Sequence, residues 1–408
     1  MRISTKMMFD SGAQNQLSLQ ADLYKLQNQL STGRKILTPA DDPVAAAQAL
    51  VVSQRQSINQ QFMDNQGAAE SLLAEQESRL ASISDLLVAV KERLVQAGNG
   101  SYSDGDRKIL AAEIRERYDE LLGLANSTDS MGNYVFSGSR GNTRPFDVSG
   151  SPGARTITYS GDDGRRQLQV SSRRIMDVSE SGKDVFMRIS EGNGVFEFSA
   201  GSNNTGTGSL GTSSVVTGFD GNTYLLQFST PTIYSVTTTT PGSPPTSVTS
   251  TPQTFTSGDS ISLGGGGISI SIGGSPAAGD QFTVEPARNQ DIFSSLDQLI
   301  KTLETPAAGS PTAQAAMRNT LTNIDSNLNN ALDHIVSRQT SIGARRVELE
   351  ALSSFAGDLD TQYQSDLSKL QDLDYTKAIS EMANRKIALE AAQASFAKVS
   401  QMSLFSYL

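Results

Sequence analysis

The sequence predicts an α+β protein of several domains, in which long helices from both ends of the chain flank a central β-rich insert. Two patterns support this fold class. Between residues 321 and 373, apolar side chains recur in alternating steps of three and four, the heptad pattern of a helix with a narrow apolar seam. Between about 146 and 285 the period changes to two, with turn residues every 8 to 12 positions or so.

The predicted helix over 321–373 would form a rod of roughly 80 Å at about 1.5 Å per residue. No proline interrupts this stretch. A seam of that length needs a partner of similar length. It belongs either to one long helix in an ordinary bundle or to a coiled coil completed by another part of the chain or by other copies. The seam residues predicted here are Ile335, Ile342, Leu349 and Leu352.

The first 31 residues carry a shorter heptad stripe among many glutamines and asparagines. Such a polar segment is marginal as an isolated helix and becomes stable when its stripe is covered, which we expect on assembly. The stripe contains Leu19, Leu23, Leu26 and Leu30. Gly33 then suits the end of a helix.

A second helix is predicted to begin at Pro43, with Asp42 as its N-cap. Its apolar period runs to Leu94 and ends at Gly98–Gly100, and Asp104 or Asp106 is expected to cap a third helix. These two helices would form an antiparallel hairpin that pairs with the C-terminal rod. The seam residues predicted on the hairpin are Leu80, Leu87 and Leu94.

Seven strands are predicted in the insert, at 156–159, 166–170, 195–199, 224–228, 233–237, 268–272 and 281–284. The dipeptides Asp163-Gly164 and Asp220-Gly221 are typical of hairpin turns. The Ser/Thr/Pro-rich run 237–256 is either an exposed loop or a strand pair at a sheet edge. Helical spacing returns at 292–303.

Composition excludes several classes of function. The net charge of −10 and a pI of about 4.8 argue against nucleic acid as a partner, because phosphate binding needs a clustered basic face. The chain has no cysteine, no tryptophan and one histidine. We expect neither a Sec-type signal peptide nor a membrane span, since no apolar run is long enough.

No catalytic, cofactor or metal site is predicted. His334 lies beside the seam of the long helix, and a single histidine cannot build a zinc site without cysteines or grouped carboxylates. The acidic pairs Asp41-Asp42 and Asp162-Asp163 adjoin helix caps or turns, which explains them. The glycines at 264–267 lack the Lys-Ser/Thr of a phosphate loop, so we interpret them as a β turn. The protein is predicted not to be an enzyme.

Both ends of the chain carry recognisable motifs. LSTGRK at 30–35, followed by PADDPVAA at 39–46, resembles the N-terminal signature of bacterial flagellins and their relatives. The stretch 94–104 resembles the turn after the second helix of flagellins. ALEAA at 388–392 and VSQMSLF at 399–405 resemble their C-terminal region.

Two further details favour the flagellin-related hook-associated proteins of the hook–filament junction over flagellin itself. These are YVFSGSRGNTRPF at 134–146, which resembles that family's turn from helix into β insert, and the ending SLFSYL at 403–408. The resemblance covers about 1–175 and 280–408. Flagellin remains the alternative, and a coiled-coil adhesin or phage fibre is a more distant one.

The resemblance implies a flagellin-like layout. Residues 1–40 with 376–408 would form the inner coiled-coil layer on assembly, 41–143 with 286–375 a helical bundle, and 144–285 an outward β insert. The assembly residues it implies are the N-terminal stripe named above together with Ile379, Met382, Leu389, Phe396, Val399, Met402, Leu404, Phe405 and Leu408.

The resemblance also implies a location and partners. The protein would be exported by the flagellar type III apparatus and located at the hook–filament junction of the flagellum. Expected partners are other copies in a ring-like homo-oligomer, the hook-side hook-associated protein, flagellin, and an export chaperone that binds the C-terminal region. Neither nucleic acid nor membrane is expected.

Overall fold

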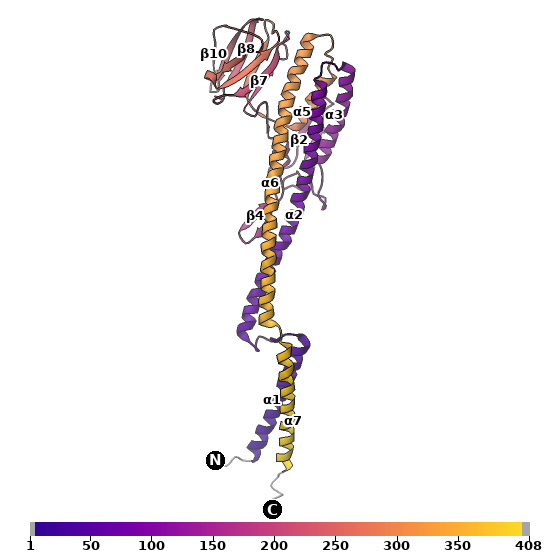
Figure 1. Cartoon of the computed structure of the whole chain (residues 1–408), viewed down its shortest axis with the longest axis vertical. Helices are drawn as coiled ribbons and strands as arrows, with labels where there is room; N and C mark the ends of the chain where they lie inside the picture. The colour runs from indigo at the N-terminus through magenta and orange to yellow at the C-terminus, as the bar shows by residue number, and fades with distance from the viewer. Residues whose placement is uncertain (1–4, 402–408) are drawn as a thin grey trace, which may run out of the picture. The chain divides into compact units, whose positions relative to one another are not determined.

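A computed structural model describes residues 5–401 of the chain (Figure 1). The chain divides into two units, which we call the terminal unit (residues 1–65 and 351–408) and the central unit (66–350). The two longest helices, α2 (Pro43–Ala97) and α6 (Pro311–Gln371), contribute residues to both units. Within the described residues, no helix is long and apolar enough to cross a membrane.

The terminal unit is helical. It contains α1 (Thr5–Thr32), the first part of α2, the last part of α6, and α7 (Tyr375–Gln401). The Asp42 carboxylate accepts a hydrogen bond from the Ala45 amide at 3.0 Å, as expected of an N-cap. The seam predicted to continue to residue 373 stops at Gln371, where the chain turns before α7 begins.

The helices α3, α4 and α5, the last part of α2 and the first part of α6 form the helical part of the central unit. The N-cap of the helix α3 (Asp104–Ala125) is Ser103, not Asp104 or Asp106 as predicted from sequence. The Ser103 hydroxyl accepts from the Asp106 amide while the Asp106 carboxylate accepts from the Ser103 amide, so Asp106 completes a capping box. The helix α5 (Ile292–Glu304) lies along α3, with Phe293 packed edge-on against Tyr118.

The first strands of the insert belong to the core of the helical part. Two hairpins, β1 (Phe146–Ser149) with β2 (Thr156–Tyr159) and β3 (Gln167–Ser171) with β4 (Arg174–Asp177), precede the short helix α4 (Gly182–Phe186). Phe146 packs against Phe186 and Phe293 at ring-centroid distances of 5.3 and 5.4 Å. These strands therefore share a core with α5.

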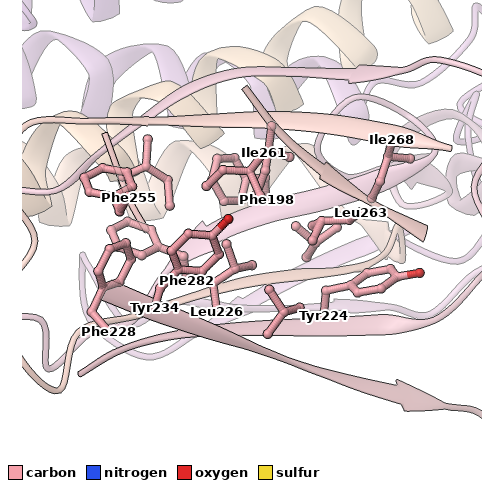
Figure 2. Close-up of a cluster of buried hydrophobic side chains, with 14 of the residues drawn as sticks. Phe198, Tyr224, Leu226, Phe228, Tyr234, Phe255, Ile261, Leu263, Ile268 and Phe282 are labelled. Atoms are coloured by element: carbon pink, nitrogen blue, oxygen red, sulfur yellow. The ribbon is translucent and has the colours of Figure 1, made fainter. Parts of the chain in front are cut away.

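The remaining strands form two antiparallel sheets around a separate core. One sheet has the order β10-β9-β8-β14-β6 with β11 also on β9, and the other has the order β12-β13-β7. The strands are β6 (Phe196–Ala200), β7 (Ser209–Val215), β8 (Thr223–Thr230), β9 (Ile233–Thr240), β10 (Thr246–Thr249), β11 (Gln253–Thr254), β12 (Ser260–Leu263), β13 (Ile268–Gly273) and β14 (Gln281–Pro286). Figure 2 shows their buried aromatic and aliphatic side chains between the sheets. We call this part the β sandwich.

The β sandwich has a narrow connection to the rest of the central unit. The strands β5 (Ile189–Ser190) and β15 (Asn289–Gln290) pair immediately before and after it. On α6, the Asn319 side chain bonds to the backbone of Gly208 and Leu210, and the Asn327 amide oxygen accepts from the Gly192 amide. Asn319 therefore attaches the β sandwich to α6, and Asn327 attaches the connection that precedes β6.

Each of the seven predicted strands coincides with an observed strand, but both predicted hairpin turns are wrong. Asp163-Gly164 connects β2 to β3, which do not pair, and Asp220-Gly221 connects β7 to β8, which lie in different sheets. Turn residues permit a reversal, whereas the buried faces decide which strands pair. In the run 237–256, β10 pairs with β9 at a sheet edge, so the strand-pair alternative is the correct one. At 264–266 a 3-10 turn joins the paired strands β12 and β13.

Candidate assembly surfaces

The two ends of the chain pack against each other as antiparallel helices, α1 along α7. The rings of Phe9 and Phe396 lie 4.6 Å apart between centroids. Gly12 leaves room for the Phe396 ring, because a Cβ at position 12 would lie 2.9 Å from a ring carbon. Gln16 donates to the Ala392 carbonyl oxygen, and Arg385 pairs with Asp22. The helix α1 thus has a partner within the same chain, whereas the sequence led us to expect its stripe to be covered on assembly.

The predicted assembly residues fall into three groups. Half-buried between α1 and α7, or beside this contact, are Leu19, Leu23, Leu26, Leu30, Met382, Leu389 and Phe396. Ile379 is 53% exposed on α7. Val399 belongs to α7, and Met402, Leu404, Phe405 and Leu408 lie outside the described residues.

A short backbone ladder joins the ends of α1 and α6. Lys35 donates its amide to the Gln371 carbonyl oxygen at 2.7 Å, and Leu373 donates to the Gly33 carbonyl oxygen at 2.9 Å. Gly33 has φ of +70°, the left-handed conformation that ends a helix, and a Cβ there would lie 2.9 Å from the Tyr375 hydroxyl oxygen. The motif at 30–35 therefore forms the point where the chain leaves α1 beside the start of α7.

Asp41 stabilises the loop that follows. Its carboxylate lies 2.7 Å from the Lys25 ammonium and accepts from the Leu37 and Thr38 amides. These contacts hold the pKa of Asp41 well below its usual range, and the hydrogen bond from Lys25 has the largest effect. Asp41 is the first aspartate of the PADDP motif, and its ion pair with Lys25 connects the loop to α1.

The predicted bundle seam lies on the facing sides of α2 and α6. Leu80, Leu87, Leu94, Ile335, Ile342 and Leu349 are buried, and Leu352 is half-buried. Beside this seam, Arg346 of α6 pairs with Glu70 and Glu77 of α2. These two carboxylates raise the pKa of the Arg346 guanidinium.

A buried charge cluster that sequence reasoning missed lies where β4 and α4 meet α6. Glu180 is fully buried, and one carboxylate oxygen pairs with Arg345. The other oxygen lies 3.5 Å from Arg165 and 3.9 Å from Arg338. Arg338 and Arg345 interrupt the apolar heptad of α6 at seam positions, a signal that their partner would be acidic and buried.

The polar residues considered for catalysis have structural partners. His334 lies 2.6 Å from the Asp184 carbonyl oxygen, and burial lowers its pKa. Asp162 accepts from the Ser139 and Gly164 amides, within the turn where it was predicted. Within residues 5–401, no group of three or more His, Cys, Asp or Glu side chains is arranged to hold a metal ion.

The known proteins that are similar to this chain are components of the bacterial flagellum. The family model for the bacterial flagellin N-terminal helical region matches residues 3–141, which include α1, α2 and α3. The crystal structure of the flagellar junction protein FlgL from Legionella pneumophila aligns with a TM-score of 0.69 and 31% identity, covering 80% of this chain and 100% of that one. The chain belongs to the FlgL family.

Other members of the FlgL family are similar to this protein over most of its length. The flagellar hook-associated protein 3 of Salmonella typhimurium is 27% identical over 405 residues, or 99% of both chains. FlgL from Xanthomonas campestris aligns with a TM-score of 0.70 and 29% identity, covering 78% of this chain and 99% of that one. The protein is therefore a flagellar hook-associated protein with a flagellin-like helical region and a structural role in motility.

Proposed function

We propose that this protein is the structural subunit that joins the hook-side hook-associated protein to the flagellin filament. The observation that carries the proposal is the pairing of α1 with α7, which gathers both ends of the chain into one helical layer. The name of the Legionella relative, a flagellar junction protein, supports the same position. The subunit acts by packing and has no catalytic step.

The proposed subunit is divided by role along its chain. Residues 1–40 with 376–408 form the inner coiled-coil layer, 41–143 with 286–375 the helical bundle, and the insert from 144 to 285 faces outward. Copies associate in a ring through the helical termini and contact flagellin on one side and the hook-side protein on the other. Before assembly the chain passes through the flagellar type III apparatus, with a chaperone on its C-terminal region.

Flagellin is the second candidate, and the two differ in where the protein lies. The similarity to hook-associated protein 3 supports the junction role, since it extends over 99% of this chain, whereas the similarity to flagellin B of Vibrio cholerae extends over 36%. An adhesin or phage fibre has no support from these relatives.

The test is the position of an epitope-tagged chain on flagella isolated from a strain that lacks the native protein. A junction subunit gives a single narrow label where filament meets hook, and its removal abolishes attached filaments. Label along the whole filament would favour flagellin instead. Attached filaments of normal number without the protein would contradict the junction role.

A further inference from the structure

Two stretches of the terminal unit are exposed helices without any charged residue. They are residues 11–21 of α1 and 43–54 of α2, in a chain that is 19% charged. Solvent-facing helix surfaces normally carry charged side chains, whereas the centres of protein interfaces are depleted of them. The absence of charged side chains therefore indicates that both stretches become buried in a protein interface.

An apolar stripe begins in the stretch on α1 and continues to Tyr24, just past its end, beside the contact with α7. Leu17 is 65% exposed and Tyr24, seven residues later on the same helix face, is 68% exposed. The side chains that face α7, such as Gln16 and Leu23, lie on a different side of the helix. The stripe thus remains uncovered after the two ends of the chain have paired.

The stretch on α2 forms one wall of an open apolar groove of about 540 Å³. Val51 and Val52 of α2 and Leu370 of α6 line it, and Val51 is 49% exposed. At its rim, Asp366 and Lys369 pair with each other at 3.3 Å, so the rim charges cancel. On α2 the lining runs from Ala47 to Val52, and the paired charges of Asp366 and Lys369 leave the groove without net charge.

We infer that the Leu17–Tyr24 stripe of one copy docks in the Val51–Leu370 groove of a neighbouring copy. This inference rests on the proposed function, in which copies of the chain assemble. Both surfaces are apolar and carry no net charge, and each lacks a cover in its own unit. Because stripe and groove are different surfaces, the contact is heterologous, and repeating it produces a ring or helix rather than a closed dimer.

The natural chain contains no cysteine, so paired cysteines report this contact without background. The full-length double variant Leu17→Cys/Val51→Cys, expressed in a strain lacking the native protein, is oxidised in isolated flagella. A non-reducing gel should then show a ladder of multimers. Co-expressed single variants Leu17→Cys and Val51→Cys should give dimers and nothing larger.

A matched control places the second cysteine on an equally exposed valine outside the groove. Leu17→Cys/Val248→Cys uses Val248, which is 71% exposed in β10, and should give no ladder. Incorporated protein without a ladder, or dimers from Leu17→Cys alone, would overturn the inference while leaving the proposed function intact. Absence of every variant and of the unmodified chain from flagella would overturn both.

Discussion

At the scale of single residues, Glu180 is a fully buried carboxylate whose desolvation has to be compensated. A buried carboxylate is tolerated only where cations and hydrogen bonds replace water, and here three arginines from two segments surround it. Two of the three arginines come from α6, and Arg345 also donates to the Asp177 carbonyl oxygen at 3.0 Å. The cluster therefore attaches the end of β4 to one particular turn of α6.

Replacing Arg345 with leucine should destabilise the central unit by about 3 kcal/mol, because it leaves the Glu180 carboxylate buried with weaker compensation. The matched control is Arg174→Leu. Arg174 pairs with Glu348 at 2.6 Å at an exposed position, where such a pair contributes about 1 kcal/mol or less. Urea unfolding, monitored by circular dichroism, measures the change in unfolding free energy of both variants. Equal losses for the two variants would contradict the assigned role of Glu180.

Glu197 should make the β sandwich less stable as pH rises. Burial, followed by the neighbouring carboxylates Glu191 and Glu285, raises the pKa of Glu197 to about 7. Glu285 lies directly opposite it on β14. The folded protein therefore retains a proton that the unfolded chain has lost, so stability is complete below about pH 4.5 and decreases as pH rises through about 7.

The substitution Glu197→Gln removes this dependence. We expect a gain of about 1–2 kcal/mol at pH 8, allowing for solvent screening, and almost no change at pH 4. Thermal unfolding of both proteins between pH 4 and pH 8 measures the difference. A gain that is the same at both pH values would mean that the effect comes from packing rather than from the proton.

At the scale of elements, the helices end where the backbone requires it. The helix α1 stops at a glycine with positive φ, and the chain then bonds to the end of α6 through Lys35 and Leu373. Asp42 and Ser103 cap α2 and α3. These local signals determine the length of each helix, while its partner is determined by the side chains along its apolar face.

Gly33→Ala should destabilise the end of α1 by about 1–2 kcal/mol, since alanine disfavours the left-handed conformation. The added Cβ would also displace the Tyr375 side chain. Gly67→Ala is the control: Gly67 lies within α2 with open space around it, and the substitution should stabilise the helix by about 0.5–1 kcal/mol. Thermal melting at 222 nm should move in opposite directions for the two variants, and a shift in the same direction would count against the cap.

At the scale of the whole molecule, the insert consists of two parts with different roles. The strands β1 to β4 share buried side chains with the helices, as the packing of Phe146 on Phe293 shows. The β sandwich has its own core, and Asn319 of α6 bonds to its backbone at Gly208 and Leu210. Only the second part is separable without opening an apolar core.

Replacing residues 193–286 with a short Gly/Ser linker should leave a soluble helical protein. The linker would join β5 to β15, which already pair through Ser190 and Asn289, so the ends to be joined are adjacent. Asn319 would lose its partners Gly208 and Leu210 and become exposed to water, which solvates amides readily, whereas Asn327 keeps Gly192 and Gln290. Under the proposed function, a strain carrying this variant should still form attached filaments.

The matched comparison removes residues 147–284, a deletion that also takes away Glu180 and Phe186. This variant should fail to fold, because Arg345 loses its carboxylate partner and Phe293 loses a neighbouring ring. Circular dichroism of the two purified proteins measures the contrast. A well-folded product from the longer deletion would show that β1 to β4 are dispensable for the helical core.

The sequence by itself determined the long helices, seven of the strands and the flagellin-like motifs, because heptads, alternation and caps are local patterns that each segment carries alone. Only the tertiary structure decided which segments cover one another. It paired α1 with α7 inside one chain, separated the strands flanking Asp163-Gly164 and Asp220-Gly221, and buried Glu180 among arginines distant in sequence. These outcomes depend on complementarity between surfaces far apart along the chain, and no local period encodes that complementarity.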